Sequence, residues 1–160
     1  MTHTPSPSAA PSSAPAPAST PASASAGALR DSARFLRLVL RVDSVSTAVM
    51  GVVLIAAAAP LGSATGMPVA FAVAFGIFQM GGAASLALIA GYAVIPPALA
   101  LTVVAVNGLC AVGCVVTAFA DFVPLTGFGV VFMLIGALIV AVCTALQYTG
   151  LRRMTAAARA

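Results

Sequence analysis

Charged residues are almost absent from the middle of this chain of 160 residues. Between Asp43 and Arg152 the only charged residue is Asp121. Across the whole chain 6% of residues are charged and 61% are hydrophobic, whereas a soluble domain averages about 25% charged residues. A soluble fold of this length would lack the polar side chains needed to cover its surface. The sequence therefore predicts an integral membrane protein.

Four apolar runs, separated by short links, follow the first basic residues. A helix that crosses the apolar core of a bilayer needs about 20 residues, and each run reaches that length. We expect helices over residues 36–59, 67–92, 97–119 and 124–149. The runs lack the alternating polarity of β-barrel strands, so the predicted fold class is all-α. Because the links are short, consecutive helices should be antiparallel neighbours in a bundle of four transmembrane helices.

The first part of the chain has a different composition. Residues 1–28 are mostly Pro, Ala, Ser and Thr, which supply too little apolar surface to compensate the entropy of ordering. We expect a disordered cytoplasmic tail with polyproline II character, either simply solvated or used to dock a partner. It lacks the basic start and apolar core of a signal peptide. The membrane domain is expected over residues 29–153, followed by a short cytoplasmic tail, residues 154–160.

The basic residues are all arginines, in one group before the first apolar run and one after the last. Those that predict orientation are Arg34, Arg37, Arg41, Arg152 and Arg153. Cytoplasmic flanks carry the excess of basic residues, and an even number of spans places both termini on one side. We therefore expect both termini in the cytoplasm. Exclusive use of Arg, with abundant Ala, Gly and Val, is typical of GC-rich bacteria and suggests a bacterial inner membrane.

Two amide side chains lie far from the ends of their predicted helices. Gln79 falls in the second predicted helix and Asn107 in the third, and both should lie near the middle of the membrane. An unpaired amide at that depth is costly. We expect the two side chains to bond to each other or to backbone carbonyls and so join two helices. The alternative is that they line a path for a substrate.

Asp43 lies in the first turns of the first predicted helix, close to the inner interface of the membrane. At the inner end of the fourth predicted helix lie Gln147 and Tyr148, followed by Arg152. We expect the Asp43 carboxylate to accept hydrogen bonds from these side chains and to join the first and fourth helices. The alternative is a carboxylate that couples proton movement to transport. For that role Asp43 would have to lie deeper than the count from the inner interface indicates.

No arrangement of residues predicts catalysis, a metal site or a cofactor. Cys110 and Cys114 lie one helical turn apart, but Cys143 should lie roughly 10 Å away along the membrane normal. The only histidine, His3, is in the tail. Neither a zinc ligand set nor a nucleophile–base pair is therefore expected, and we do not expect an enzyme. Without a basic stripe interleaved with aromatic residues, nucleic acid is not an expected partner either.

The segments LRVDSV, VVAVNGLCAVG and LQYTGLRR resemble a family of small bacterial integral membrane proteins that opens with LR-x-D and closes with LQY-x-GLRR. The resemblance covers residues 36–153. It implies a four-helix protein of the inner membrane and no particular activity. The chain has Ala145 where that family often has Glu, and Cys110 where it often has an aromatic residue. The positions that the resemblance marks are Arg37 or Arg41, Asp43, Asn107, Gln147, Tyr148, Gly150, Arg152 and Arg153.

These features predict a small membrane protein in contact with the lipid bilayer and with other membrane proteins or copies of itself. The role we expect is that of a structural or accessory subunit of a membrane complex. The alternative is a small homo-oligomeric transporter or channel. A transporter needs a continuous polar path, and only two amides are expected at mid-depth, which favours the accessory role.

Overall fold

The computed structural model describes residues 21–159, and within them the chain forms helices and no strands. The helices are α1 (Pro21–Ala56), α2 (Ala58–Thr65), α3 (Val69–Gly91), α4 (Pro97–Phe119) and α5 (Gly127–Ala157). All except α2 are long and apolar enough to cross a membrane. The predicted all-α fold with four membrane helices is confirmed.

Helix α1 begins earlier than the sequence indicated. Residues 21–28, which we expected to be disordered, form its first turns. Alanine is the strongest helix former, and it recurs in this stretch. The rest of the predicted tail, residues 1–20, lies outside the described residues.

The C-terminal end of α1 is set by a proline. Pro60 has no N–H to donate to the carbonyl of Ala56, four residues earlier, and α1 ends at Ala56. After the break at Ala57 the chain turns into α2, which ends at Thr65 and is followed by the capping residue Gly66 with φ of 77°, a conformation that glycine adopts without strain. The predicted helix 36–59 is therefore divided, and most of the expected link is helical.

Helix α5 extends well beyond its predicted end. We expected the last helix over residues 124–149 and a tail over residues 154–160, but α5 continues to Ala157. The bounds of α3 and α4 lie close to the predicted 67–92 and 97–119. The longer α5 matters for the candidate site, because it places Gln147 well inside a helix and not at its end.

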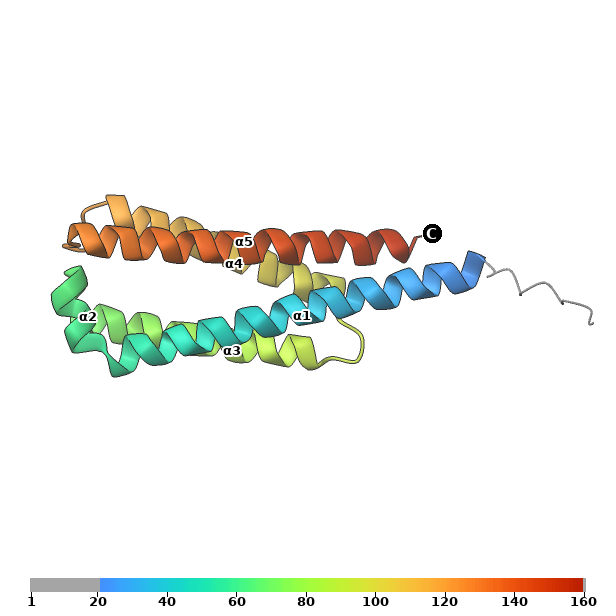
Figure 1. Ribbon diagram of the computed structural model, residues 1–160, viewed down its shortest axis with the longest axis horizontal. Coiled ribbons are helices and arrows are strands. Elements are labelled where there is room, and N and C mark those ends of the chain that lie inside the picture. Colours follow the sequence, from blue (N-terminus) through green and yellow to red (C-terminus); the bar gives the residue numbers. More distant parts are fainter. Residues whose placement is uncertain (1–20, 160) are drawn as a thin grey trace, which may run out of the picture.

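The membrane helices form two antiparallel pairs, α1 with α3 and α4 with α5, which are joined mainly through α1 and α5 (Figure 1). Helices α3 and α4 follow one another in the chain but hardly touch. The described ends of the chain lie at the same end of the bundle. We call this the Arg end, because Arg34, Arg37, Arg152 and Arg153 lie there, and we call the opposite end the α2 end.

Helices α1 and α3 approach each other closely at two glycines. A Cβ atom on Gly76 would lie 2.7 Å from Cγ1 of Ile55 and 2.8 Å from the backbone oxygen of Gly51. Nearer the Arg end, the Ser44 hydroxyl donates to the carbonyl of Ala83 at 2.8 Å. Small residues allow this close backbone packing, on which helix association in lipid depends.

Two apolar cores fill the bundle, one at each end. The core at the Arg end draws on all four membrane helices and the α3–α4 link: Leu36, Leu40, Leu86, Ala90, Ile95, Ala100, Val103, Leu151 and Met154. The core at the α2 end consists of Ala58, Met67, Ala72, Cys114, Ala118, Met133 and Ala137. Small side chains are more frequent in the second core, and polar side chains lie between the two.

Helix α2 is attached to the start of α5. The backbone N–H of Thr126 donates to the carbonyl of Thr65, and its hydroxyl donates to the carbonyl of Ala64, both at 2.8 Å. The same hydroxyl accepts from the N–H of Gly129 and so caps α5. These bonds connect the α1–α3 pair to the α4–α5 pair at the α2 end.

Candidate functional site

Three polar side chains from three helices bond to one another inside the bundle. Nε2 of Gln147 donates to Oδ2 of Asp43 at 2.6 Å. Nδ2 of Asn107 donates to the same Oδ2 at 2.7 Å and to Oε1 of Gln147 at 3.1 Å. The Thr47 hydroxyl reaches the other carboxylate oxygen, Oδ1, at 3.4 Å. We call Asp43, Asn107 and Gln147 the polar triangle.

Two of the three residues of the polar triangle are buried. Asp43 is 4% exposed and Gln147 is 1% exposed, and Asn107 is half-buried. Because the three residues come from α1, α4 and α5, their bonds connect the two helix pairs. Hydrogen bonds to a charged group contribute about 1.5–3 kcal/mol each, about twice as much as neutral ones. The polar triangle is therefore a stabilising contact between the pairs.

Asp43 lies deeper than the sequence indicated. Asn107 is near the middle of the 23-residue helix α4, and the 2.7 Å bond places the Asp43 carboxylate beside it. The prediction of a position close to the interface was wrong, because it counted depth from a first helix that begins at residue 36, whereas α1 begins at Pro21. With α5 continuing to Ala157, Gln147 and its partner Asp43 lie in the interior of the membrane domain.

The Asp43 carboxylate has no cationic partner in the described part of the chain. The one ion pair within residues 21–159 joins the exposed side chains of Arg34 and Asp31 at 3.9 Å. Amide and hydroxyl donors around Asp43 stabilise its negative charge. A carboxylate buried in a membrane without a counter-ion is costly and is often a site of function.

The predicted pairing of Gln79 with Asn107 is not present. Asn107 bonds to Asp43 and Gln147, and within residues 21–159 no hydrogen bond involves the side chain of Gln79, which is half-buried. The physical reason is the separation of α3 from α4. Short links do not force consecutive helices to pack along their whole length, and α3 packs on α1 instead.

Tyr148 and Arg152, two of the donors expected for Asp43, lie elsewhere. Tyr148 is 47% exposed, and the Arg152 guanidinium lies 5.8 Å from the centre of its ring. Successive residues of a helix point in directions about 100° apart, so Tyr148 turns outward where Gln147 turns inward. Of the three expected donors, the structure brings only Gln147 to Asp43.

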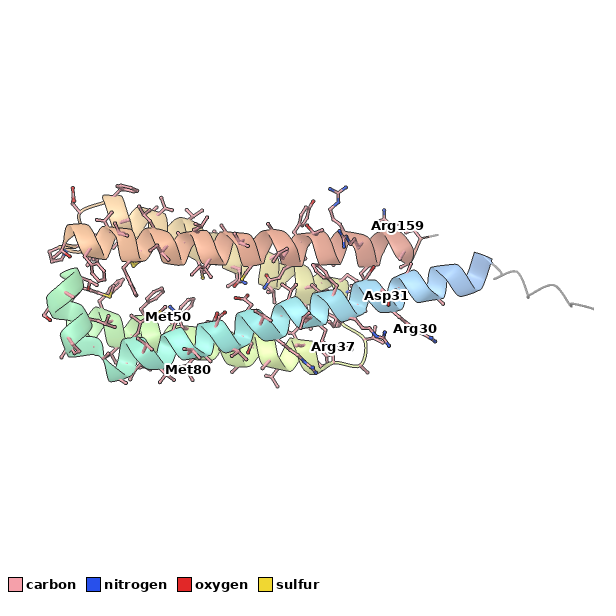
Figure 2. All side chains as sticks on the ribbon, viewed as in Figure 1. Arg30, Asp31, Arg37, Met50, Met80 and Arg159 are labelled. Carbon is pink, nitrogen blue, oxygen red and sulfur yellow. The ribbon has the colours of Figure 1, made fainter. Side chains whose placement is uncertain are left out.

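The arginines labelled in Figure 2, Arg30, Arg37 and Arg159, lie at the Arg end. The Arg37 guanidinium donates to the carbonyls of Tyr92 and Ala93 at 2.7 and 3.1 Å, and so satisfies acceptors at the end of α3. The Arg153 guanidinium lies 5.5 Å from the centre of the Phe35 ring. Arg41 is exposed. Arg37 and Arg153 therefore connect helices as well as indicating topology.

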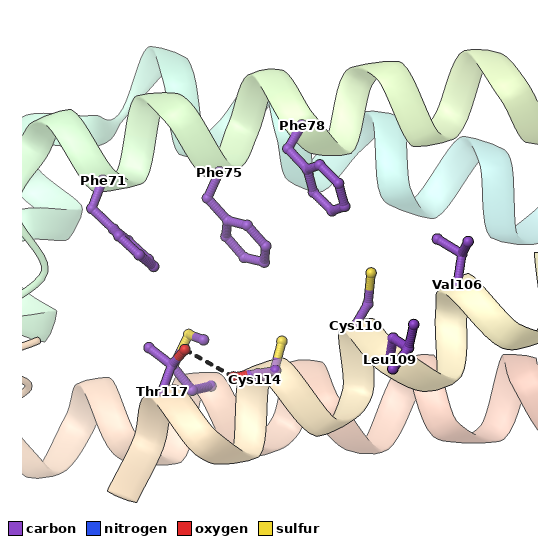
Figure 3. A pocket seen from close by; sticks show the side chains of 10 residues that line it. Phe71, Phe75, Phe78, Val106, Leu109, Cys110, Cys114 and Thr117 are labelled. Atoms are coloured by element: carbon purple, nitrogen blue, oxygen red, sulfur yellow. Dashed lines mark hydrogen bonds between the residues drawn. The ribbon is translucent and has the colours of Figure 1, made fainter. Parts of the chain in front are cut away.

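A groove lies between α3 and α4, on the α2 side of the polar triangle. Its volume is about 480 Å³, within the range of small-molecule sites. We call it the α3–α4 groove. In Figure 3 Phe71, Phe75 and Phe78 project from α3 toward Cys110, Cys114 and Thr117 of α4.

The walls of the α3–α4 groove are almost entirely apolar. The three phenylalanines form a row, with 6.1 Å between the ring centres of Phe71 and Phe75 and 6.3 Å between those of Phe75 and Phe78. The Thr117 hydroxyl donates to the carbonyl of Gly113 at 2.8 Å, so its proton is already used. The groove therefore offers aromatic and aliphatic surface over most of its length.

The cysteines are free thiols, of which Cys110 and Cys114 line the groove. Cys143 lies one turn before Gln147 on α5, next to the polar triangle. Within residues 21–159 no three His, Cys, Asp or Glu side chains come together as a metal site would require. The arrangement instead provides a buried negative charge beside an aromatic groove.

Sequence reasoning did not identify the phenylalanines of α3 as a group. Their spacing of four and three residues places them on one face of a helix, which was a visible signal. In a membrane helix that signal does not distinguish a lipid-facing stripe from the wall of a groove. Only the separation of α3 from α4 makes the distinction.

Comparisons with known proteins found no match: no family model, curated protein or solved structure matches the chain. The fold defines the class: a small multi-pass membrane protein with four apolar spanning helices.

Proposed function

We propose that this protein is a structural or accessory subunit of a membrane complex in the bacterial inner membrane, with both termini in the cytoplasm. The observation that most supports this role is that the residues of the polar triangle bond to one another. Asp43, Asn107 and Gln147 bond to one another across three helices, so their polar atoms hold the bundle together. The proposed role is not catalytic.

The proposed orientation rests on the charges at the Arg end. The arginines of α1 and α5 flank the membrane segments at one end of the bundle, and the positive-inside rule places that end in the cytoplasm. Reporter fusions at residues 5 and 158 test this orientation. We expect cytoplasmic signals from both, and an external signal from either would contradict it.

The accessory role is tested by native mass spectrometry of the full chain, released gently from its own membrane. We expect a heteromeric complex in which this chain is present together with another membrane protein. A monomer or a homo-oligomer alone, released under conditions that keep other membrane complexes intact, would contradict the accessory role.

A second function, a small homo-oligomeric transporter, is favoured by one observation. A groove of about 480 Å³ lies next to a buried carboxylate that has no cationic partner among residues 21–159. Closing that groove around a substrate would require α3 to move toward α4, with which it makes few contacts. A homo-oligomer that retains a small molecule in native mass spectrometry would place this function first.

A further inference from the structure

Two amide groups in the middle of the bundle have hydrogen-bonding capacity left over. Within residues 21–159 the Gln79 side chain makes no hydrogen bond, and Oδ1 of Asn107 accepts none. Every fully buried side-chain nitrogen or oxygen in this part of the chain has a partner. Gln79 and Asn107 are both half-buried. Because their unpaired atoms are not among the fully buried atoms, these atoms must be accessible from outside the protein.

Both amides lie where the α3–α4 groove ends toward the Arg end. Gln79 is one turn after Phe75 on α3, and Asn107 is one turn before Cys110 on α4. Phe75 and Cys110 both line the groove. The residues therefore place two unpaired amides from facing helices at the same end of one groove.

Lipid tails provide no partner for these amides. An unsatisfied polar group in the hydrocarbon region costs several kcal/mol, and protein folds rarely leave one there. An occupant with a polar or charged group at this end of the groove would lower that cost. The same occupant must be apolar along the rest of the groove, where the phenylalanines line the wall.

The negative charge of Asp43 determines which sign of charge a ligand in the groove would carry. Oδ2 of Asp43 accepts both short amide bonds, whereas Oδ1 receives the longer 3.4 Å contact from Thr47. No Arg in the described residues forms an ion pair with it. In surroundings of low dielectric constant the field of this carboxylate reaches farther than it would in water. A cation at the amide end of the groove would therefore be favoured and an anion opposed.

The row of aromatic rings also suits a cation with an apolar body. Phe71, Phe75 and Phe78 present ring surface along the groove (Figure 3). Aromatic faces attract cations, most strongly where water is excluded. The apolar surface, the aromatic rings and the buried negative charge all favour a ligand with an apolar body and a positive charge.

We propose that the α3–α4 groove binds an apolar organic cation, such as a protonated amine or a quaternary ammonium. The apolar body lies against Phe71, Phe75 and Phe78. The charged end lies beside Asn107 and Gln79, within the field of Asp43. This site goes beyond the accessory role and is independent of whether the protein has a protein partner.

The test uses two ions of nearly the same size and shape but opposite charge, tetraphenylphosphonium and tetraphenylborate. Binding of each is measured by equilibrium dialysis against the full chain in lipid nanodiscs, with empty nanodiscs subtracted. We expect saturable binding of tetraphenylphosphonium at one site per chain. Absence of saturable cation binding, or equal binding of the anion, would overturn the proposal.

Two substitutions test whether the charge of Asp43 favours cation binding. Asp43→Asn removes the negative charge but keeps an oxygen that accepts from Asn107 and Gln147, so the bundle should still fold. We expect it to weaken cation binding about tenfold, the equivalent of about 1.4 kcal/mol. The matched control is Asp121→Asn, an exposed carboxylate in the α4–α5 link, which should bind as the unchanged chain does. Unchanged binding by Asp43→Asn would overturn the assignment.

A second pair of substitutions tests where the apolar body of the cation binds. Phe75→Ala removes the middle ring of the row and should weaken cation binding several-fold. Phe128→Ala, at an exposed position on α5, should have no effect. Thermal melting of the helical circular dichroism signal shows that each variant is folded. Equal binding by a folded Phe75→Ala and by Phe128→Ala would place the cation elsewhere and contradict the proposed site.

Discussion

At the Arg end of the bundle all four membrane helices meet in one core, whereas at the α2 end α3 stands apart from α4. The first core is filled by large side chains such as Leu36, Leu40 and Leu86. In the second, mostly small residues of α2, α3, α4 and α5 form the core, and the α3–α4 groove remains. The polar triangle lies between the core at the Arg end and the groove at the α2 end.

The difference shows how a uniformly apolar sequence obtains distinct regions. In lipid the helices gain little from hiding apolar surface, so close packing and hydrogen bonds decide which faces meet. At the Arg end large side chains and the bonds of Arg37 draw α3 into the bundle. At the α2 end the glycines of α1 and α3 hold α3 against α1, and no comparable contact joins α3 to α4.

The largest effect is expected from enlarging the close crossing of α1 and α3. In Gly76→Leu the new side chain would collide with the backbone of Gly51 and with Ile55, and overpacking of this kind costs about 1–3 kcal/mol or more. We expect a fall in the thermal midpoint of the helical circular dichroism signal. Gly81→Leu is the matched control on the same helix, because a Cβ atom there meets nothing within 4 Å. Equal midpoints for the two variants would contradict the crossing.

Removing one corner of the polar triangle should have the next largest effect. Gln147→Leu deletes a buried donor to Asp43 and an acceptor for Asn107, which should cost about 2 kcal/mol. Unfolding in a graded series of denaturing detergent measures the loss. Gln79→Leu removes an amide that has no hydrogen bond in the described residues, and it should not destabilise the bundle. A larger loss from Gln79→Leu than from Gln147→Leu would reverse our assignment of the mid-depth amides.

A smaller effect is expected at the Arg end from Arg37→Met. The substitution removes the donors to the carbonyls of Tyr92 and Ala93 at an exposed position, where such bonds contribute about 0.5–1 kcal/mol. Hydrogen exchange of the last turn of α3 should become faster. The comparison variant is Arg41→Met, which removes an exposed Arg from the same helix and should leave this exchange unchanged. Equal exchange in the two variants would show that Arg37 does not hold α3.

The smallest effect is expected in the α3–α4 groove. Phe78 is 56% exposed, so Phe78→Ala removes few packing contacts and should change stability by less than about 0.5 kcal/mol. Detergent unfolding, as for Gln147→Leu, provides the comparison. A loss of the size found for buried aromatic residues, about 3–5 kcal/mol, would mean that α3 and α4 pack together and that the groove is closed.

The sequence was sufficient to predict the four membrane helices, because their apolar length is a property of single segments. It did not predict which helices pack together. The short link between α3 and α4 indicated neighbours, yet the contacts of α3 depend on where Gly76 meets Gly51. Contacts between distant segments of this kind are not visible in the pattern of one run.

The candidate site was predicted in part for the same reason. Asp43, Gln147 and Asn107 were singled out individually as polar residues in apolar segments, and Asp43 was expected to contact Gln147. The partner of Asn107 was predicted wrongly, because depth was counted from expected helix ends. An error of eight residues at the end of α5 moved Gln147 to the interface and hid its place beside Asn107.

The most direct measurement is solid-state NMR of the full chain in lipid bilayers, recording through-space correlations between side-chain amide nitrogens and the Asp43 carboxyl carbon. The structure predicts correlations from Gln147 and Asn107, whose nitrogens lie 2.6 and 2.7 Å from the carboxylate oxygen, and none from Gln79. Correlations of the Asp43 carboxyl carbon with arginine nitrogens, or of Asn107 with Gln79, would contradict the polar triangle and the separation of α3 from α4.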